Sequence, residues 1–274
     1  MKNKLKNFLR SLLKAAASPG VPRLISRLTR SIVKKVVKFG PLRQGEYTLS
    51  LYGVWLRNRW NDATFRFCVN ASYGFFYSDW IENIDECVFI DIGANQGLYS
   101  LLAEKNPRIS RVYAFEPQPE IFAIFKQNIE RNDAKRVIAF PYAISNSAEA
   151  RDMQIKSGHS GAATLRDAAV PESKFGQSIR IVTVNKDFLG SSIELPENTR
   201  IAIKIDTEGH EAQVLAELME STLWDRVFNI FYEVDERYID NVKILETLKG
   251  YGFSIIYQNG EKPHYDLMLQ RSIL

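Results

Sequence analysis

The chain has 274 residues, of which 45% are hydrophobic and 25% charged. This length suffices for one large domain or two small ones, with a core that needs no disulfide or metal to be stable. The balance excludes collagen-like, low-complexity and wholly disordered chains. Cys68 and Cys87 are the two cysteines and form no C-x-x-C pair. Their spacing argues against a disulfide scaffold or zinc finger and favours a reducing compartment, the cytoplasm.

The formal charge of +4 is unevenly distributed along the chain. Residues 1–40 hold eleven Lys and Arg and no acidic residue. The remaining 25 basic and 32 acidic residues give residues 41–274 a formal charge of −7. The basic character therefore belongs to the N-terminal tail. Because the body is acidic, it has the wrong sign for a nucleic-acid groove, and we expect no nucleic-acid partner.

The tail, residues 1–40, has the pattern of two basic amphipathic helices separated by Ser18-Pro19-Gly20. The apolar positions at helical spacing are Leu5, Phe8, Leu9, Leu12, Leu13 and Ala16, then Val21, Leu24, Ile25, Leu28, Ile32, Val36 and Phe39. Such helices suit an anionic membrane surface, at its inner face, whereas charges interrupt every run too soon for a transmembrane span. Packing of one stripe on the protein's own body and an organelle transit peptide are the alternatives.

Residues 41–84 are predicted to form a small aromatic-rich subdomain, in which eleven aromatic residues crowd into 34 positions. Tyr47–Leu51 and Phe65–Phe67 alternate as half-buried strands do, and Ser78 suits the cap of a short helix. Exposed aromatic rings stack well on sugar faces, so the subdomain could form a lid over an acceptor. Packing of the rings into a core of their own is the alternative.

From residue 85 to 274, short apolar runs alternate with helical patterns. Strands are predicted at 88–92, 111–115, 137–140, 201–205, 228–232, 253–258 and 265–270, with helices at 97–105, 118–132, 211–219 and 241–249. This α/β alternation predicts a parallel sheet covered on both faces, with the ligand at the carboxyl ends of its strands. Asn259-Gly260 favours a hairpin turn, which makes the final strand antiparallel.

The end of the first of these strands carries the strongest signal, Asp91-Ile92-Gly93-Ala94-Asn95-Gln96-Gly97. It lacks the G-x-G-x-x-G of a dinucleotide fold. Asp91 suits a ligand with a cationic amino-acid end, and glycines at the turn let the backbone approach it. Glu116 ends the second strand, 23 residues beyond Gly93, where a carboxylate can accept both ribose hydroxyls. Together these features predict S-adenosylmethionine.

Acidic residues follow the fourth and fifth strands of the body. Asp206, with Glu208 and His210 just beyond it, and Glu233 should meet beside the cofactor loop. We expect Asp206, Glu208 or His210 to activate or orient an acceptor hydroxyl. Asp206 and Glu233 are hard oxygen ligands that suit magnesium or a similar cation. The alternative is that Glu208 stabilises a helix dipole and Glu233 is only a hydrogen-bond partner.

Lys204 lies inside an otherwise apolar strand and is grouped with the predicted catalytic residues. A buried lysine requires a carboxylate, and Glu233 or Asp206 is the nearest candidate. His159 lies in a polar insertion, where we expect a solvated loop histidine. His264 has no partner that the sequence reveals.

Three segments resemble the FkbM-type methyltransferases: residues 91–97, residues 113–117 (Tyr-Ala-Phe-Glu-Pro) and residues 203–211 (Ile-Lys-Ile-Asp-Thr-Glu-Gly-His-Glu). They occur in the family's order and spacing, and the likeness spans roughly Tyr73 to Arg271. The resemblance implies a class I methyltransferase fold, a Rossmann-like seven-stranded sheet whose last strand is antiparallel, over residues 85–274. It also implies S-adenosylmethionine-dependent O-methylation, commonly of a sugar in a glycolipid, polysaccharide or glycosylated metabolite.

The resemblance assigns roles by position. The cofactor-binding residues that it implies are Asp91, Gly93, Ala94, Asn95 and Gly97 for the methionine end, Glu116 and Pro117 for the ribose and Ala143 for adenine. Thr207 stands where the family more often has valine. Asn185 stands where an aspartate is usual, so no role is carried to it.

Two other functions compete with methyl transfer. A membrane-tethered protein could hold S-adenosylmethionine or a glycolipid without turnover, but a non-catalytic chain has no need of the acids at Asp206, Glu208 and Glu233. An NAD(P)-dependent sugar oxidoreductase is disfavoured by the missing glycine fingerprint and by the absence of a Tyr-x-x-x-Lys.

Overall fold

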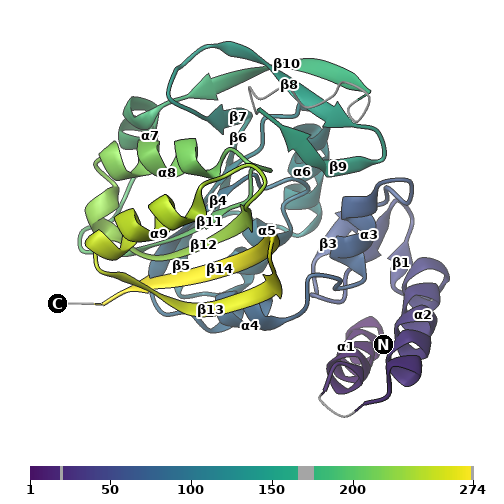
Figure 1. Cartoon of the computed structure of the whole chain (residues 1–274). Helices are drawn as coiled ribbons and strands as arrows, with labels where there is room; N and C mark the ends of the chain where they lie inside the picture. The colour runs from purple at the N-terminus through teal and green to yellow at the C-terminus, as the bar shows by residue number, and fades with distance from the viewer. Residues whose placement is uncertain (19–20, 166–175, 273–274) are drawn as a thin grey trace.

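The structure is a computed structural model that describes residues 1–18, 21–165 and 176–272. A seven-stranded sheet lies at its centre (Figure 1). Its strands are β4 (Cys87–Ile92), β5 (Ile109–Phe115), β6 (Val137–Phe140), β11 (Ile201–Ile205), β12 (Val227–Asp235), β13 (Phe253–Glu261) and β14 (His264–Arg271). The order across the sheet is β13-β14-β12-β11-β4-β5-β6. β14 runs antiparallel to both of its neighbours, which confirms the predicted antiparallel last strand.

Helices cover both faces of this sheet, as the alternation predicts. They are α4 (Phe76–Asn83), α5 (Leu98–Lys105), α6 (Pro119–Arg131), α7 (Lys186–Ser192), α8 (Glu211–Glu220) and α9 (Asn241–Gly250), with a short 3-10 turn at Trp224–Arg226. Successive strand residues point to opposite faces. Phe89 accordingly packs in a core with α4, α5 and α6, whereas Val88 and Ile90 pack in a second core with α7, α8 and α9. Both cores leave the carboxyl ends of the parallel strands at one edge.

A second sheet lies above that edge in Figure 1. It contains β7 (Tyr142–Ile144), β8 (Ala150–Lys156), β9 (His159–Thr164) and β10 (Gln177–Val184), in the order β7-β10-β8-β9. The prediction of a polar loop around His159 is therefore wrong, because this residue begins β9. Small residues fill β9 (His-Ser-Gly-Ala-Ala-Thr), so it lacks the β-branched and aromatic pattern by which strands are found.

Residues 41–84 contain a three-stranded sheet of β1 (Arg43–Gln44), β2 (Tyr47–Leu49) and β3 (Trp55–Arg57), followed by α3 (Ala63–Val69) and α4. The strand predicted for Phe65–Phe67 is wrong, because these residues lie in α3. The Asp62 side chain caps this helix by accepting from the Thr64 amide at 2.9 Å, and the tertiary contacts of a buried face outweigh a three-residue alternation. Ser78 does not cap α4, which begins two residues earlier; its hydroxyl donates to the Phe75 carbonyl.

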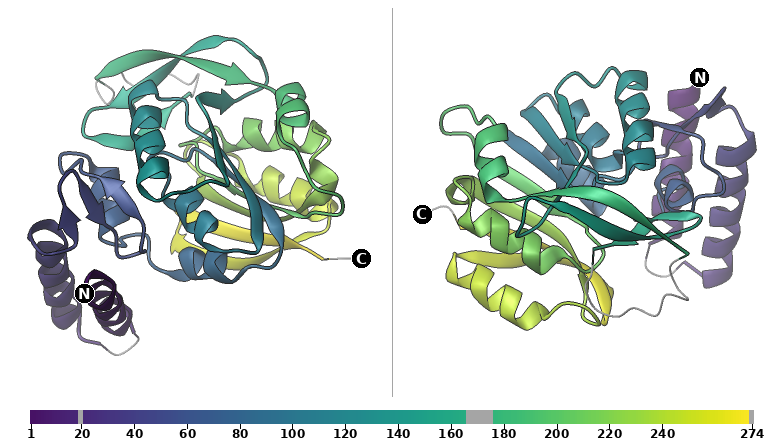
Figure 2. Two further views of the ribbon diagram at one scale, coloured as in Figure 1. Left: turned by 180° about the vertical axis from the view of Figure 1, so that it is seen from behind. Right: turned by 90° about the horizontal axis from the view of Figure 1, so that it is seen from above.

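The tail forms α1 (Lys2–Ala16) and α2 (Arg23–Phe39), which lie beside the small sheet and apart from the seven-stranded sheet (Figures 1 and 2). The predicted break at Pro19-Gly20 lies outside the described residues. No helix in the described ranges combines the length and the apolar character that crossing a bilayer requires.

The final hairpin differs from the prediction in its turn. Asn259 and Gly260 belong to β13, where they pair with Asp266 and Tyr265 of β14. β13 continues three residues past its predicted end at residue 258, and the chain reverses after Glu261, because the ladder between the strands continues past the Asn-Gly dipeptide.

Candidate active site

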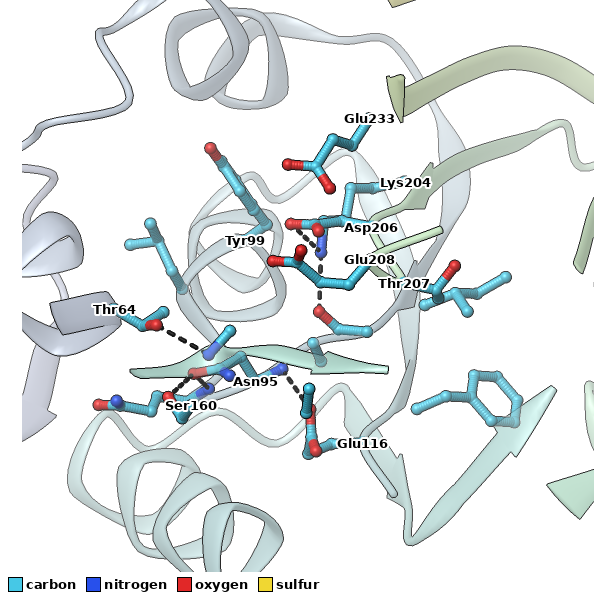
Figure 3. Close-up of a pocket in the computed structure, with 18 of the residues that line it drawn as sticks. Thr64, Asn95, Tyr99, Glu116, Ser160, Lys204, Asp206, Thr207, Glu208 and Glu233 are labelled. Atoms are coloured by element: carbon cyan, nitrogen blue, oxygen red, sulfur yellow. Dashed lines mark hydrogen bonds and ion pairs between the residues drawn. The ribbon is translucent and has the colours of Figure 1, made fainter. Parts of the chain in front are cut away.

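A cavity of about 300 Å³ lies at the carboxyl ends of the parallel strands. The main sheet supplies its base, and β8, β9 and the aromatic segment 64–77 supply its walls. Figure 3 shows the polar side chains that point toward it. This is the position at which open α/β sheets bind ligands, because several strand ends and their loops converge there.

The loop after β4 forms one side of the cavity, and its backbone requires Gly93. This residue has φ +75°, and a Cβ added to it would lie 1.9 Å from the Asp206 carbonyl oxygen. Asn95 also has a positive φ, 50°, which asparagine tolerates better than most residues. Its side-chain oxygen accepts from the Gln96 amide at 3.0 Å and from the Ser160 hydroxyl at 3.1 Å. The loop is therefore held in one conformation by β11 and by β9.

Glu116 is buried at the end of β5 and faces the same loop. One carboxylate oxygen accepts from the Asn95 amide and the other from the Gln118 amide, each at 2.8 Å. Burial raises the pKa of Glu116 to about 7, although the two amides lower it. Each oxygen keeps a further acceptor site, so the carboxylate can receive two adjacent hydroxyls.

Lys204 lies at the centre of a buried ionic group. It is the direct neighbour of Asp91 in the ladder of β11 and β4. Its ammonium donates to the Gly93 carbonyl at 2.8 Å and lies 3.3 Å from Asp91 and 3.5 Å from Asp206. Burial lowers the pKa of Lys204, but Asp206 and Asp91 outweigh it, and the net shift is upward. Of the two predicted partners, Asp206 is confirmed and Glu233 is not.

Asp91 does not line the cavity, contrary to its assigned role at the methionine end. One carboxylate oxygen accepts from both the amide and the hydroxyl of Ser100, at 3.0 and 2.6 Å. These contacts satisfy an amide in the first turn of α5, where a negative charge is favourable. The other oxygen faces Lys204, so Asp91 contacts the start of α5 and the lysine and not the cavity.

Gly97 does not line the cavity either. It has φ +86°, and a Cβ there would lie 2.0 Å from the Phe125 ring of α6. The glycine is thus required for the start of α5 and for helix packing. Ala94, Pro117 and Ala143 do line the cavity, as the resemblance implies.

Three carboxylates meet at the side of the cavity away from Asn95 and Glu116, where Asp206, Glu208 and Glu233 point toward one another (Figure 3). Each offers one oxygen, and the three oxygens lie within 4.8 Å of one another. Glu208 adopts φ 55°, and its carbonyl accepts from the Thr164 hydroxyl of β9 at 2.9 Å. A strained backbone held by a neighbouring strand is typical of functional loops.

His264 is the residue that the sequence analysis most clearly missed. Its Nε2 lies 2.7 Å from a Glu233 carboxylate oxygen. This hydrogen bond to Glu233 raises the pKa of His264 to about 9. Burial and then Asp206 raise the pKa of Glu233 to about 7, against the opposing effect of His264. No sequence motif indicates this pair, because it depends on how β14 lies beside β12.

The remaining polar residues of the loop after β11 have structural contacts. The Glu211 carboxylate accepts from the Thr207 and Gly209 amides at 2.8 and 3.0 Å, so it holds the loop that presents Glu208. His210 is buried and lines the cavity, with its Nε2 3.1 Å from the Ser145 hydroxyl.

The rings of the aromatic segment divide between the core and the cavity. Tyr52 and Phe65 are buried in the core. Other rings line the cavity: Phe67, Tyr73, Phe76, Tyr77, Tyr99 and Tyr257. Tyr77 stacks on Phe231 of β12 with 3.8 Å between ring centroids. His159 also lines the cavity, edge-to-face with Phe67 at 5.9 Å, and is not a solvated loop residue.

The sheet and its site define the class of protein. In chain order the strands are arranged 3-2-1-4-5-7-6 with the seventh antiparallel, and the ligand site follows the first and second strands. This is the class I methyltransferase fold that the resemblance implies.

The chain belongs to the FkbM methyltransferase family: residues 91–255 match the model of the methyltransferase FkbM domain. The protein is an S-adenosylmethionine-dependent methyltransferase, and the predicted family is confirmed.

Among curated proteins, the chain is 28% identical to Methyltransferase 1 of Beauveria bassiana, over 68% of this chain and 79% of the relative. It is 30% identical to the 31-O-demethyl-FK506 methyltransferase FkbM of Streptomyces tacrolimicus, over 62% and 73%. It is 28% identical to the hexuronic acid methyltransferase AglP of Haloferax volcanii, over 48% and 49%.

Proposed function

We propose that the protein transfers a methyl group from S-adenosylmethionine to a hydroxyl of a sugar, in a glycolipid, a polysaccharide or a glycosylated metabolite. One observation carries the proposal: the carboxylates Asp206, Glu208 and Glu233 face the glycine loop across one cavity, and aromatic rings line another part of its wall. Aromatic rings suit the apolar faces of a sugar, and carboxylates suit its hydroxyls. The similarity to the hexuronic acid methyltransferase AglP is consistent with a sugar acceptor.

The cavity fits the methyl donor at the end opposite the carboxylates. The backbone at Gly93 and Asn95 is open to a ligand, and Glu116 has two acceptor sites for ribose hydroxyls. Gln96 is buried, lines the cavity and has a side-chain oxygen without a protein partner among the described residues, which can accept from an ammonium group. When bound, the donor supplies an activated methyl group on a sulfonium.

The carboxylates at the other end have the task of preparing the acceptor. A sugar hydroxyl is a weak acid, so a base must remove its proton as the new bond forms. We assign this task to Asp206, whose position Lys204 fixes at 3.5 Å. Glu208 orients the acceptor, and His210 supports the wall behind it. Lys204 and Asp91 act as positioning residues, because neither can reach an acceptor while they hold each other and the loop.

We also propose a divalent cation, magnesium or similar, held by Asp206, Glu208 and Glu233. Three carboxylate oxygens within 4.8 Å of one another suit such an ion. It would lower the pKa of a bound hydroxyl. Chelation by EDTA should then reduce methyl transfer and should lower the Tm of the protein, and added magnesium should restore both. Unchanged activity and unchanged Tm after chelation would refute the proposal that the protein holds a cation.

In the absence of a bound cation, the charge of the acceptor end favours a hydroxyl over a carboxylate as the methyl acceptor. Asp206, Glu208, Glu233 and Asp266 all line it, against Lys204, which is already paired, and His264. Burial, and to a smaller extent Asp206, raise the pKa of Asp266 to about 6. Mild alkali distinguishes the two products, because a methyl ester on a carboxylate releases methanol whereas a methyl ether on a hydroxyl stays intact.

The tail supports a lipid-linked acceptor. Residues 1–40 carry eleven basic and no acidic residues, so we propose that the enzyme works at an anionic membrane surface, on its cytoplasmic face. A lipid-linked sugar would be concentrated at that surface.

Binding and transfer are tested separately. Calorimetry should show binding of S-adenosylhomocysteine and none of NAD. Incubation with labelled S-adenosylmethionine and lipid or polysaccharide fractions should then yield an alkali-stable methylated sugar. Asp206→Asn should keep the affinity for S-adenosylhomocysteine and lose transfer by about 100-fold or more. Full activity of Asp206→Asn would refute the assignment of the base, and label recovered only in protein or nucleic acid would refute the sugar.

A further inference from the structure

The apolar stripes of the two tail helices have different surroundings. In α1 half of the stripe is used for packing, because Leu9, Leu13 and Ala16 are buried, whereas Phe8 and Leu12 remain exposed. Arg10 and Lys14 of the same helix form ion pairs with Asp79 of α4. α1 is therefore fixed to the body of the protein by both apolar and ionic contacts.

α2 turns its stripe outward. The side chains that it exposes are Leu24 at 68%, Ile25 at 52%, Leu28 at 55%, Ile32 at 61% and Phe39 at 75%. On a helix that advances about 100° per residue, these five positions fall within an arc of about 100°. The residues that bury α2 against the protein are Val33 and Val37, whose centre lies about 150° away. The main apolar face of α2, defined as these five exposed residues, is thus left uncovered by the rest of the described chain.

Basic residues occupy much of the remaining surface of α2. They are Arg23, Arg27, Arg30, Lys34 and Lys35, all exposed. Lys35 lies inside the apolar arc, Arg27 about 60° beyond its edge and Arg30 about 120° beyond it. Within the ranges that the structure describes, none of these five forms an ion pair, in contrast to Arg10 and Lys14 of α1. A helix with an exposed apolar arc and unpaired cations around it has the composition of an element that lies in the interface of an anionic bilayer.

We infer that the apolar face of α2 inserts into the headgroup region of an anionic membrane, while α1 acts as the rigid connection between α2 and the catalytic body. Charge complementarity favours an anionic membrane as the partner of this face. The unpaired cations of α2 suit lipid phosphates, and its apolar arc suits the acyl chains below them. A second copy of this chain would bring the same cations together. The inference assigns contact to α2 and does not depend on which sugar is methylated.

The test uses the full chain and co-flotation with vesicles of phosphatidylcholine, with and without phosphatidylglycerol. Leu28→Glu should reduce partition to the anionic vesicles by about ten-fold or more, since it removes the burial of one leucine. Val242→Glu is the matched control. Val242 is an exposed helical residue of α9, 64% exposed, and the substitution changes the charge equally. It should leave partition unchanged.

The cations are tested with a second pair of variants. Arg27→Gln with Lys35→Gln, which removes the two cations nearest the apolar face, should weaken binding to anionic vesicles by about five-fold per charge at low salt, and binding should fall as salt rises. Lys126→Gln with Lys249→Gln removes the same charge elsewhere and should have little effect.

Affinity for S-adenosylhomocysteine should be unchanged in all four variants, which separates this inference from the proposed function. Failure of the intact chain to float with anionic vesicles would overturn it. Equal loss in Leu28→Glu and Val242→Glu would also do so, as would a solution dimer that Leu28→Glu converts to a monomer without vesicle binding.

Discussion

The contact between the cofactor loop and β11 makes a sharp prediction for Gly93→Ala. An alanine at φ +75° costs about 1–2 kcal/mol for the left-handed backbone alone. Its Cβ would also lie 1.9 Å from the Asp206 carbonyl oxygen, which belongs to the backbone and cannot rotate away. The ends of β4 and β11 must therefore separate, which adds about 1–3 kcal/mol. We expect a total of about 3 kcal/mol and a fall in Tm of roughly 6–12 °C.

Gly74→Ala is the matched control for this prediction. Gly74 has φ +77°, but a Cβ added there would meet no atom within 4 Å. It should therefore show the backbone cost alone, and the difference between the two variants measures the contact with Asp206. Thermal unfolding and calorimetry with S-adenosylhomocysteine are the assays. Equal Tm values for the two variants, with unchanged affinity in Gly93→Ala, would refute the reasoning.

Three further predictions concern the ionisable groups. Lys204→Met should lower the free energy of unfolding by about 3–5 kcal/mol in urea titration, because it leaves the buried Asp91 without its cation; a loss below about 1 kcal/mol would contradict the ion pair. The pKa of Glu116 is about 7 in the folded protein, above the ordinary 4.5, so between these pH values the native state keeps a proton that the unfolded chain has lost. The free energy of unfolding of the ligand-free protein should therefore fall as the pH rises from about 4.5 to about 7. The loss should reach up to about 3 kcal/mol, at 1.36 kcal/mol per pKa unit, and Glu116→Gln should flatten that part of the curve; an identical curve for the variant would assign the pH dependence to other groups. The His264 hydrogen bond lowers the pKa of Glu233, so His264→Asn should move the acidic limb of the pH profile of methyl transfer to higher pH, and an unmoved limb would show that Glu233 does not act in the reaction.

Most of the main sheet could be predicted from the sequence because each strand is short, apolar and bounded by helical periodicity. Ile201–Ile205 is buried at every position, so its pattern leaves no alternative. The prediction failed where the local pattern was too short or too plain. Phe65–Phe67 alternates over only three residues, and the capped helix α3 prevails. β9 is built from small and polar residues that resemble a loop.

In the candidate site, too, the sequence predicted the positions of some residues along the chain but not their contacts. Gly93, Glu116, Asp206, Glu208 and Glu233 line the cavity and could be predicted, because each lies at or near the carboxyl end of a strand and these ends converge at one edge of a parallel sheet. The direction in which each side chain points could not be predicted from the sequence. Asp91 pairs directly with Lys204 in the ladder of β4 and β11, and its carboxylate lies 3.3 Å from the lysine ammonium and outside the cavity.

The sequence by itself determined the family, the order of the strands' motifs and the concentration of positive charge in residues 1–40, because these depend on residue type and spacing along the chain. Only the tertiary structure decided which apolar face of α2 stays exposed, since Val33 and Val37 on its other side are the residues of this helix that are buried. It also decided the partner of His264, because the pairing of β14 with β12 brings together residues that are 31 positions apart. Local patterns specify elements, whereas contacts between distant residues depend on how those elements pack.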